Sequence, residues 1–140
     1  MYIIYAIIGA VMASVGTIFA KLGLKGVDSN LLTAIRGLIM AFVVTLVAFS
    51  FGKISVNALS SLSSKQWLYV ILSGLGGALS WLFFYYALAN GPTVSVTVID
   101  KLSIVITAIL AVIILKDSIT LQAGLGLLLI LAGTFLVVFK

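Results

Sequence analysis

Long apolar segments separated by short polar stretches dominate the chain. Five of them are close to 20 residues long, which is the length that an α-helix needs to cross a bilayer. They cover residues 2–22, 31–51, 67–89, 94–115 and 120–139. Apolar residues run on without the alternation typical of a transmembrane β-barrel. The pattern therefore predicts an all-α integral membrane protein with five transmembrane helices.

The connections between these segments are short and contain residues that start or end helices. The expected N-caps of the second, third and fourth helices are Ser29-Asn30, Ser63-Ser64 and Thr93. Since only residues 90–93 and 116–119 join the last three segments, we expect these helices to be antiparallel neighbours. So little of the chain lies outside the segments that residues 1–140 are predicted to form a single transmembrane domain.

The amino-acid composition excludes several classes of function. Hydrophobic residues make up 64% of the chain and charged residues only 8%, against about 25% charged residues in ordinary globular domains. Cys and His are absent, which excludes disulfides and thiol or imidazole catalysis, and neither a metal nor another cofactor is expected. The net charge of +5 contains no Lys/Arg block of the kind that binds nucleic acid. An enzyme is not expected, because a single carboxylate, Asp100, lies within a span.

Apart from Lys21 at the end of the first span, three ionisable residues lie inside the predicted spans: Arg36, Asp100 and Lys101. Such a group costs about 2.5–3.5 kcal/mol at the centre of a membrane helix, so each is a candidate functional residue. Arg36 and Asp100 enter the membrane from the same face at matching depth and could form a pair. Asp100 and Lys101 are neighbours on one helix and are not expected to face each other. The alternative is that Arg36 extends toward the headgroups and the other two form a polar cluster.

Polar and aromatic side chains accompany these charges. Thr97, Asp100 and Ser103 follow helical spacing and predict a polar stripe that lines an interior. Trp81 and Tyr85 lie one turn apart in the third span, where they could offer a hydroxyl, an indole N–H and a stacking surface to a small ligand. Aromatic residues are also common on lipid-facing surfaces, so both interpretations stay open.

Small residues form two stripes. The first span carries Gly9 and Gly16 among alanines, which permits close approach of another helix, either within the chain or in a second copy. The last span carries Gly126 and Gly133 seven residues apart on one face. There, self-association is a serious alternative to packing within the chain.

Several of these features together resemble a known family. They are Phe19-Ala20-Lys21, Arg36, Trp81 to Ala89 with Gly91-Pro92, Lys101-Leu102-Ser103, Leu115 to Gln122, and Gly126 to Gly133. In this combination the chain resembles a single-repeat, five-span member of the EamA-like domains of the drug/metabolite transporter superfamily. The resemblance implies secondary active transport. Longer members hold two inverted repeats, so a single repeat implies a homodimer with alternating access.

These observations lead to one hypothesis and two alternatives. The hypothesis is a proton-coupled exporter of a small anionic or zwitterionic metabolite, in which Asp100 exchanges a proton and Arg36 or Lys101 holds a carboxylate or phosphate. The sum of these three side chains is one positive charge, which favours such a ligand. The alternatives are a membrane assembly subunit that does not transport and a lipid-headgroup translocase.

The orientation in the cell membrane is weakly determined. Lysines flank the spans in equal numbers on the two sides, with Lys53, Lys65 and Lys116 on one and Lys21, Lys25 and Lys140 on the other. A clear excess of Lys and Arg on one side normally fixes the orientation. We therefore expect a multi-pass protein of the plasma or inner membrane with dual insertion and an antiparallel dimer, against the alternative of a single orientation.

Overall fold

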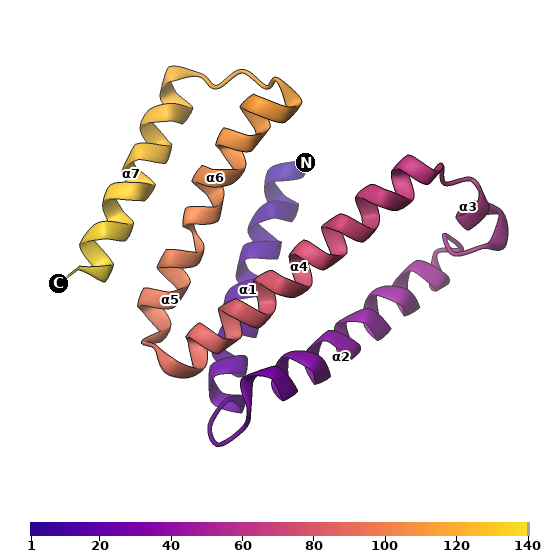
Figure 1. Ribbon diagram of the computed structural model, residues 1–140, viewed down its shortest axis with the longest axis horizontal. Helices are drawn as coiled ribbons and strands as arrows, with labels where there is room; N and C mark the ends of the chain where they lie inside the picture. The colour runs from indigo at the N-terminus through magenta and orange to yellow at the C-terminus, as the bar shows by residue number, and fades with distance from the viewer. Residues whose placement is uncertain (140) are drawn as a thin grey trace. The chain divides into compact units, whose positions relative to one another are not determined.

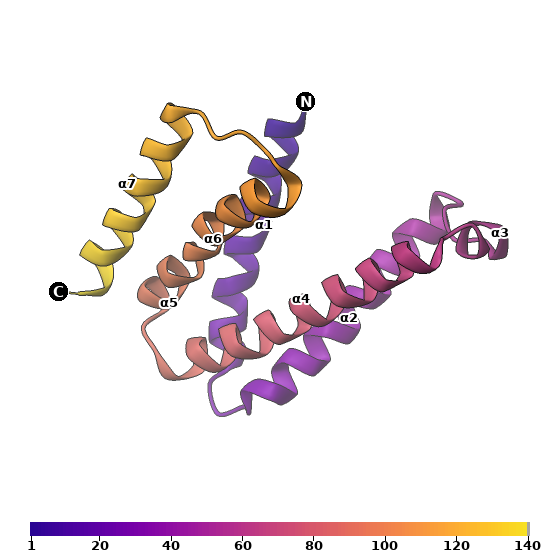
Figure 2. The ribbon, with the colours of Figure 1, turned by 45° about the horizontal axis from the view of Figure 1, so that its top comes forward.

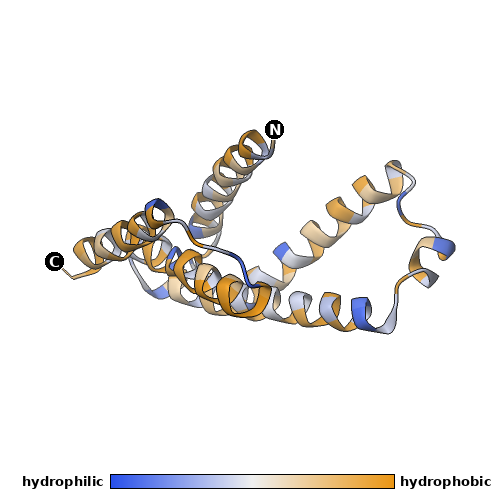
Figure 3. Ribbon diagram, turned by 90° about the horizontal axis from the view of Figure 1, so that it is seen from above, coloured by the Kyte–Doolittle hydropathy of each residue, from blue (hydrophilic) through white to orange (hydrophobic). Residues whose placement is uncertain are grey.

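The computed structural model describes residues 1–139, so Lys140 lies outside the described residues (Figure 1). This part of the chain contains five helices long and apolar enough to cross a membrane. They are α1 (Tyr2–Gly23), α2 (Ser29–Ser50), α4 (Ser64–Asn90), the helical segment Thr93–Leu115, and α7 (Leu121–Val138). Figure 3 shows hydrophobic residues along each of them and hydrophilic residues mostly near the turns. The predicted five-span, all-α membrane fold is confirmed, with boundaries shifted by a few residues.

The chain divides into two compact units, Met1–Ala89 and Asn90–Lys140. In the first unit, the C-terminal end of α1, the N-terminal end of α2 and the C-terminal end of α4 come together, as Figures 1 and 2 both show. The buried residues of this unit all lie at that junction: Ala20, Leu24, Ser29, Thr33, Tyr85 and Leu88. Most other apolar side chains are exposed, as expected of surfaces that face lipid.

The second unit contains the fourth and fifth spans. The fourth span consists of α5 (Thr93–Asp100), α6 (Leu102–Leu110) and a π-helical turn, η1 (Ala111–Leu115). The residue that follows the span, Lys116, has a positive φ of 59°. Both α5 and α6 contact α7, which runs antiparallel to them (Figure 1). The prediction that the fourth and fifth helices are antiparallel neighbours is confirmed.

Two of the three predicted N-caps are wrong. Helix α2 is capped by Asp28, whose Oδ1 accepts from the backbone N–H of Asn30 and Leu31 at 2.9 and 3.0 Å. A carboxylate is favoured there because it also interacts with the helix dipole. Pro92 occupies the N-cap position of α5, so Thr93 already lies inside the helix.

The third predicted cap is confirmed. The Oγ of Ser63 accepts from Gln66 N–H at 3.3 Å, and the Gln66 side chain accepts from Ser63 N–H at 2.8 Å. This reciprocal pair is a capping box. The connection before it is not wholly irregular, because it contains the short helix α3 (Val56–Ser60).

Candidate functional site

Arg36 of α2 contacts both other membrane-spanning helices of the first unit. It lies seven residues beyond the start of α2, or about 10 Å along the helix. Its Nη1 donates a hydrogen bond to the Gly16 carbonyl of α1 at 3.2 Å. Its Cζ lies 5.2 Å from the centroid of the Tyr85 ring of α4, a distance typical of a cation–π interaction. Arg36 therefore connects three transmembrane helices.

The absence of a side chain at Gly16 makes this contact possible. A Cβ atom placed there would lie 3.2 Å from Nη2 of Arg36, closer than nine in ten real Cβ contacts, and 3.5 Å from Nη1, an ordinary van der Waals distance. Gly9, on the same helix, has no atom within 4 Å of the equivalent position. The two glycines singled out from the sequence thus differ, since only Gly16 accommodates a neighbouring side chain.

The positive charge of Arg36 has no negative partner in the first unit. Asp28 is the one carboxylate of residues 1–89, and its Oδ1 caps α2. The Arg36 Nε is buried, and no hydrogen-bond partner for it is found in the described residues. The predicted pair of Arg36 with Asp100 would connect the two units and stays a prediction.

A cavity of about 550 Å³ opens beside the Arg36 side chain. We call it the Arg36 cavity. Apart from Arg36, the residues that line it are apolar and come from α1, α2 and the loop between them: Ala20, Val27, Leu32, Ile35, Ile39 and Met40. A single cation in an apolar lining of this size is an arrangement that can bind an organic anion.

Lys21 makes a contact between helices that the sequence did not predict. Its Nζ donates a short hydrogen bond to the backbone carbonyl of Leu88, which is fully buried. Leu88 lies in the last turn of α4, where carbonyl groups lack partners within the helix and the helix dipole favours a cation. A lysine in the last turn of an apolar helix was the available signal, but its partner lies 67 residues away along the chain.

Trp81 and Tyr85 do not share one surface. Tyr85 is only 3% exposed and lies against Arg36, with the Phe84 ring edge-on to it at 5.2 Å. Trp81 instead lines a separate groove of about 480 Å³ between α2 and α4, together with Gly37 and Gly77. A ligand in that groove would therefore contact the indole of Trp81, whereas the Tyr85 ring contacts the guanidinium of Arg36.

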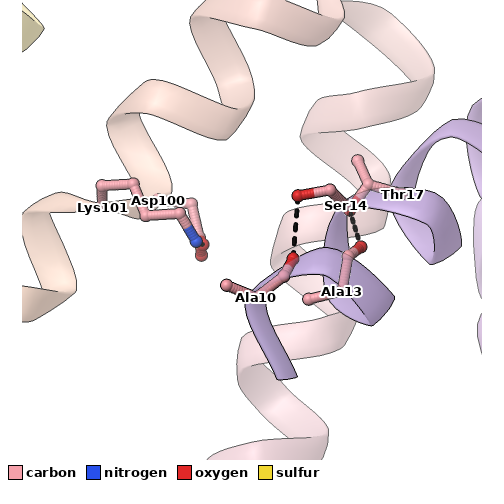
Figure 4. A network of polar contacts seen from close by, with 6 residues as sticks. All are labelled: Ala10, Ala13, Ser14, Thr17, Asp100 and Lys101. Carbon is pink, nitrogen blue, oxygen red and sulfur yellow. Dashed lines mark hydrogen bonds and ion pairs between the residues drawn. The ribbon is translucent and has the colours of Figure 1, made fainter. Parts of the chain in front are cut away.

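The expectation that Asp100 and Lys101 do not face each other was wrong. Lys101 Nζ lies 3.3 Å from Asp100 Oδ2, with both side chains partly exposed (Figure 4). The fourth span is interrupted at Lys101, which lies between α5 and α6. There, Lys101 N–H bonds to Val98 at 3.1 Å and Ile104 N–H to Lys101 at 3.0 Å. These bonds span three residues and not four, so the local twist differs from that of an α-helix.

The interruption also divides the predicted polar stripe. Thr97 lies in α5 before it and is half-buried, whereas Ser103 lies in α6 after it and is exposed.

Polar side chains of α1 follow the usual pattern for a membrane helix. Ser14 and Thr17 each donate to the carbonyl four residues earlier at 2.9 Å (Figure 4).

The glycines of α7 face open space within the chain. A Cβ at Gly126 or Gly133 would meet no atom within 4 Å. Neither glycine is therefore needed for close packing inside the described part of the chain.

Comparison with known proteins agrees with this architecture. The EamA-like transporter family matches residues 1–139. A protein from a Sinorhizobium species, described as an uncharacterized transporter in the cobO 3′ region, is 33% identical over 132 residues, which are 94% of this chain and 92% of that protein. No solved structure matches the chain. The five apolar helices and these two similarities together show that the chain belongs to the EamA-like transporter family and is a multi-pass membrane transporter.

Proposed function

We propose that the protein is a proton-coupled secondary transporter that exports a small anionic or zwitterionic metabolite across the cell membrane. The observation that carries the proposal is Arg36, a cation within a membrane span whose partners in the first unit are a neutral carbonyl and an aromatic ring. An uncompensated charge is expensive in a membrane interior. An anionic group of the cargo would supply the missing negative charge.

In this proposal Asp100 carries the proton. Its carboxylate lies 3.3 Å from the Lys101 ammonium at the interruption of the fourth span. Protonation neutralises the carboxylate and removes the attraction, so Lys101 becomes available to an anion. Loss of the proton restores the ion pair and favours release. The proton and the anion thereby bind together and leave together, so each exported anion carries one proton with it in the same direction.

Proton flux in proteoliposomes tests this role. A pH-sensitive dye inside the vesicles reports proton movement when each member of a panel of organic anions and amino acids is added. We expect at least one compound to drive flux in the wild-type protein and none to do so in Asp100→Asn. The amide retains the shape of the carboxyl group but cannot exchange a proton.

Asp117→Asn is the matched control, because Asp117 is exposed and follows the fourth span. It should behave like the wild type. Flux through Asp100→Asn at the wild-type rate would remove Asp100 from the mechanism.

We further propose that the transporter is a homodimer whose copies insert in opposite orientations. The open glycine face of α7 supports a contact between copies, because small residues allow close approach of membrane helices. Inverted pairs of units around a midplane site are a common plan for secondary transporters. Opposite insertion of identical chains would produce that arrangement.

Labelling of single cysteines in intact cells tests the dual orientation, since the chain has no native Cys. Lys25→Cys and Asn57→Cys place one thiol at each end of α2, in the connections that precede and follow it. Dual insertion predicts partial labelling from outside at both sites. Complete labelling at one site with none at the other would exclude it.

A further inference from the structure

The Arg36 cavity combines one fixed cation with an apolar wall. Arg36 is the only charged residue among those that line its volume of about 550 Å³, a size within the range of about 300–1,000 Å³ of typical ligand sites. The Lys21 ammonium is not part of this lining and lies on the Leu88 carbonyl. The chemistry of the cavity therefore depends on one guanidinium.

Within the first unit, the guanidinium is held in place without being neutralised. The Gly16 carbonyl fixes Nη1 and the Tyr85 ring lies against the guanidinium, and neither partner carries a negative charge. Within residues 1–89, the carboxylate of Asp28 is engaged at the N-terminus of α2 and does not line the cavity. One unit of positive charge in an apolar site is balanced by one unit of negative charge.

We infer that the Arg36 cavity binds amphipathic monoanions, in which a carboxylate or phosphate joins an apolar body, and discriminates against the corresponding zwitterions. The anionic group pairs with Arg36, and the body covers Leu32, Ile35 and Ile39. An added ammonium group would enter a lining that offers it no carboxylate, which makes its desolvation costly. The inference rests on the proposed function and narrows its cargo to anions with an apolar portion.

Such a ligand can come from two sources. A free organic anion in the cell and the phosphate of an anionic lipid have the same chemistry, namely one negative charge attached to hydrocarbon. Both would use the guanidinium and the apolar wall in the same way.

A matched pair of probes tests the discrimination. 3-Phenylpropionate and phenylalanine share a phenyl ring, a three-carbon chain and a carboxylate, and only phenylalanine carries an ammonium group. Acetate has the charge without the body. With purified protein in phosphatidylcholine nanodiscs, we expect 3-phenylpropionate to bind at least tenfold more tightly than the other two, measured by thermal stabilisation over a concentration series. Equal or tighter binding of phenylalanine, or equal binding of acetate, would overturn the inference.

Variants assign the binding to this cavity. Arg36→Gln should lower the affinity for 3-phenylpropionate at least tenfold, whereas Lys25→Gln removes an exposed cation near the same helix ends and should leave it unchanged. Wild-type affinity in Arg36→Gln would overturn the assignment.

Val27→Phe keeps the test decisive if Arg36→Gln fails to fold. Val27 is 41% exposed and lines the cavity, so a larger side chain should occupy the cavity without disturbing buried packing. We expect it to lower the affinity severalfold. Val43→Phe, at a position of α2 that is 50% exposed and outside the lining, is the control. Equal affinities of the two variants would place the ligand elsewhere.

Native mass spectrometry of protein from mixed phosphatidylglycerol and phosphatidylcholine identifies the source. A phosphatidylglycerol molecule retained by the wild type and lost from Arg36→Gln indicates a lipid phosphate. Binding of 3-phenylpropionate without such retention indicates a free anion. If neither ligand depends on Arg36 while Asp100-dependent proton flux is observed, the inference fails, whereas proton-coupled transport through Asp100 stands. If 3-phenylpropionate binds in an Arg36-dependent way but no proton flux is observed, the inference about the cavity stands and the proposed transport function fails.

Discussion

The contact between Gly16 and Arg36 predicts that one added methyl group will weaken the first unit. Gly16→Ala places a Cβ atom 3.2 Å from Nη2 of Arg36, so the guanidinium must shift by a few tenths of an ångström. Its hydrogen bond to the Gly16 carbonyl is already 3.2 Å long, and the shift would break it. The same shift disturbs the contact with the Tyr85 ring.

The size of the effect follows from two opposing contributions. A hydrogen bond to a charged group contributes about 1.5–3 kcal/mol. Replacing Gly by Ala inside a helix returns up to about 1 kcal/mol of helix propensity. We expect Gly16→Ala to lower the free energy of unfolding by about 0.5–3 kcal/mol.

Gly9→Ala is the matched control, since no atom lies within 4 Å of its Cβ position. It receives the same propensity gain without the contact, so it should be neutral or stabilising by up to about 1 kcal/mol. The difference between the two alanine variants, about 1.5–3 kcal/mol, is independent of the propensity estimate. It measures the lost Arg36 contact.

Reversible unfolding in mixed detergent micelles, followed by circular dichroism, gives these free energies. A double-mutant cycle with Arg36→Met isolates the pair. In the Arg36→Met background, where the guanidinium is absent, Gly16→Ala should behave like Gly9→Ala. Equal effects of the two alanine variants in the wild-type background, or a coupling energy below about 0.5 kcal/mol in the cycle, would refute the contact between Gly16 and Arg36.

Two further predictions concern the hydrogen bond of Lys21 and the glycine face of α7. Lys21→Met should lower the free energy of unfolding by about 1–3 kcal/mol, because the buried Leu88 carbonyl loses its donor. The control Lys25→Met removes an exposed lysine and should change the free energy of unfolding by less than about 0.5 kcal/mol. Equal effects of the two variants would contradict the role of Lys21. Replacing both Gly126 and Gly133 by Leu should convert the proposed dimer to monomer in detergent, measured by native mass spectrometry, with the helical circular dichroism unchanged because both Cβ positions are open. An unchanged dimer would place the contact on another helix.

Arg36 shows where sequence reasoning about the site succeeded and where it stopped. Its position in an apolar span identified it as a candidate, since any charge there needs a partner. The sequence offered Asp100 as that partner and gave no reason to choose Gly16 or Tyr85. Gly16 appeared only as one of several small residues on α1, and its difference from Gly9 depends on which helix crosses α1 at that level.

Lys101 shows a second limit. The apolar run 94–115 predicts one continuous helix, and from that geometry the side chains of Asp100 and Lys101 should diverge. The interruption at Lys101 involves no proline or glycine at that point, so local residue preferences did not reveal it. The ion pair of 3.3 Å is therefore a feature that only the structure shows.

The number and approximate limits of the five spans were determined by the sequence alone. Insertion into lipid depends on the summed hydropathy of about 20 consecutive residues, which is a local property. The contacts of Arg36 with α1 and α4, and of Lys21 with Leu88, were decided by the tertiary structure. In lipid, apolar surfaces alone favour no particular pair of helices, because hydrocarbon surrounds every face equally. Helix partners are selected instead by close approach at small residues and by polar groups that need a partner, and these depend on residues far apart in the chain.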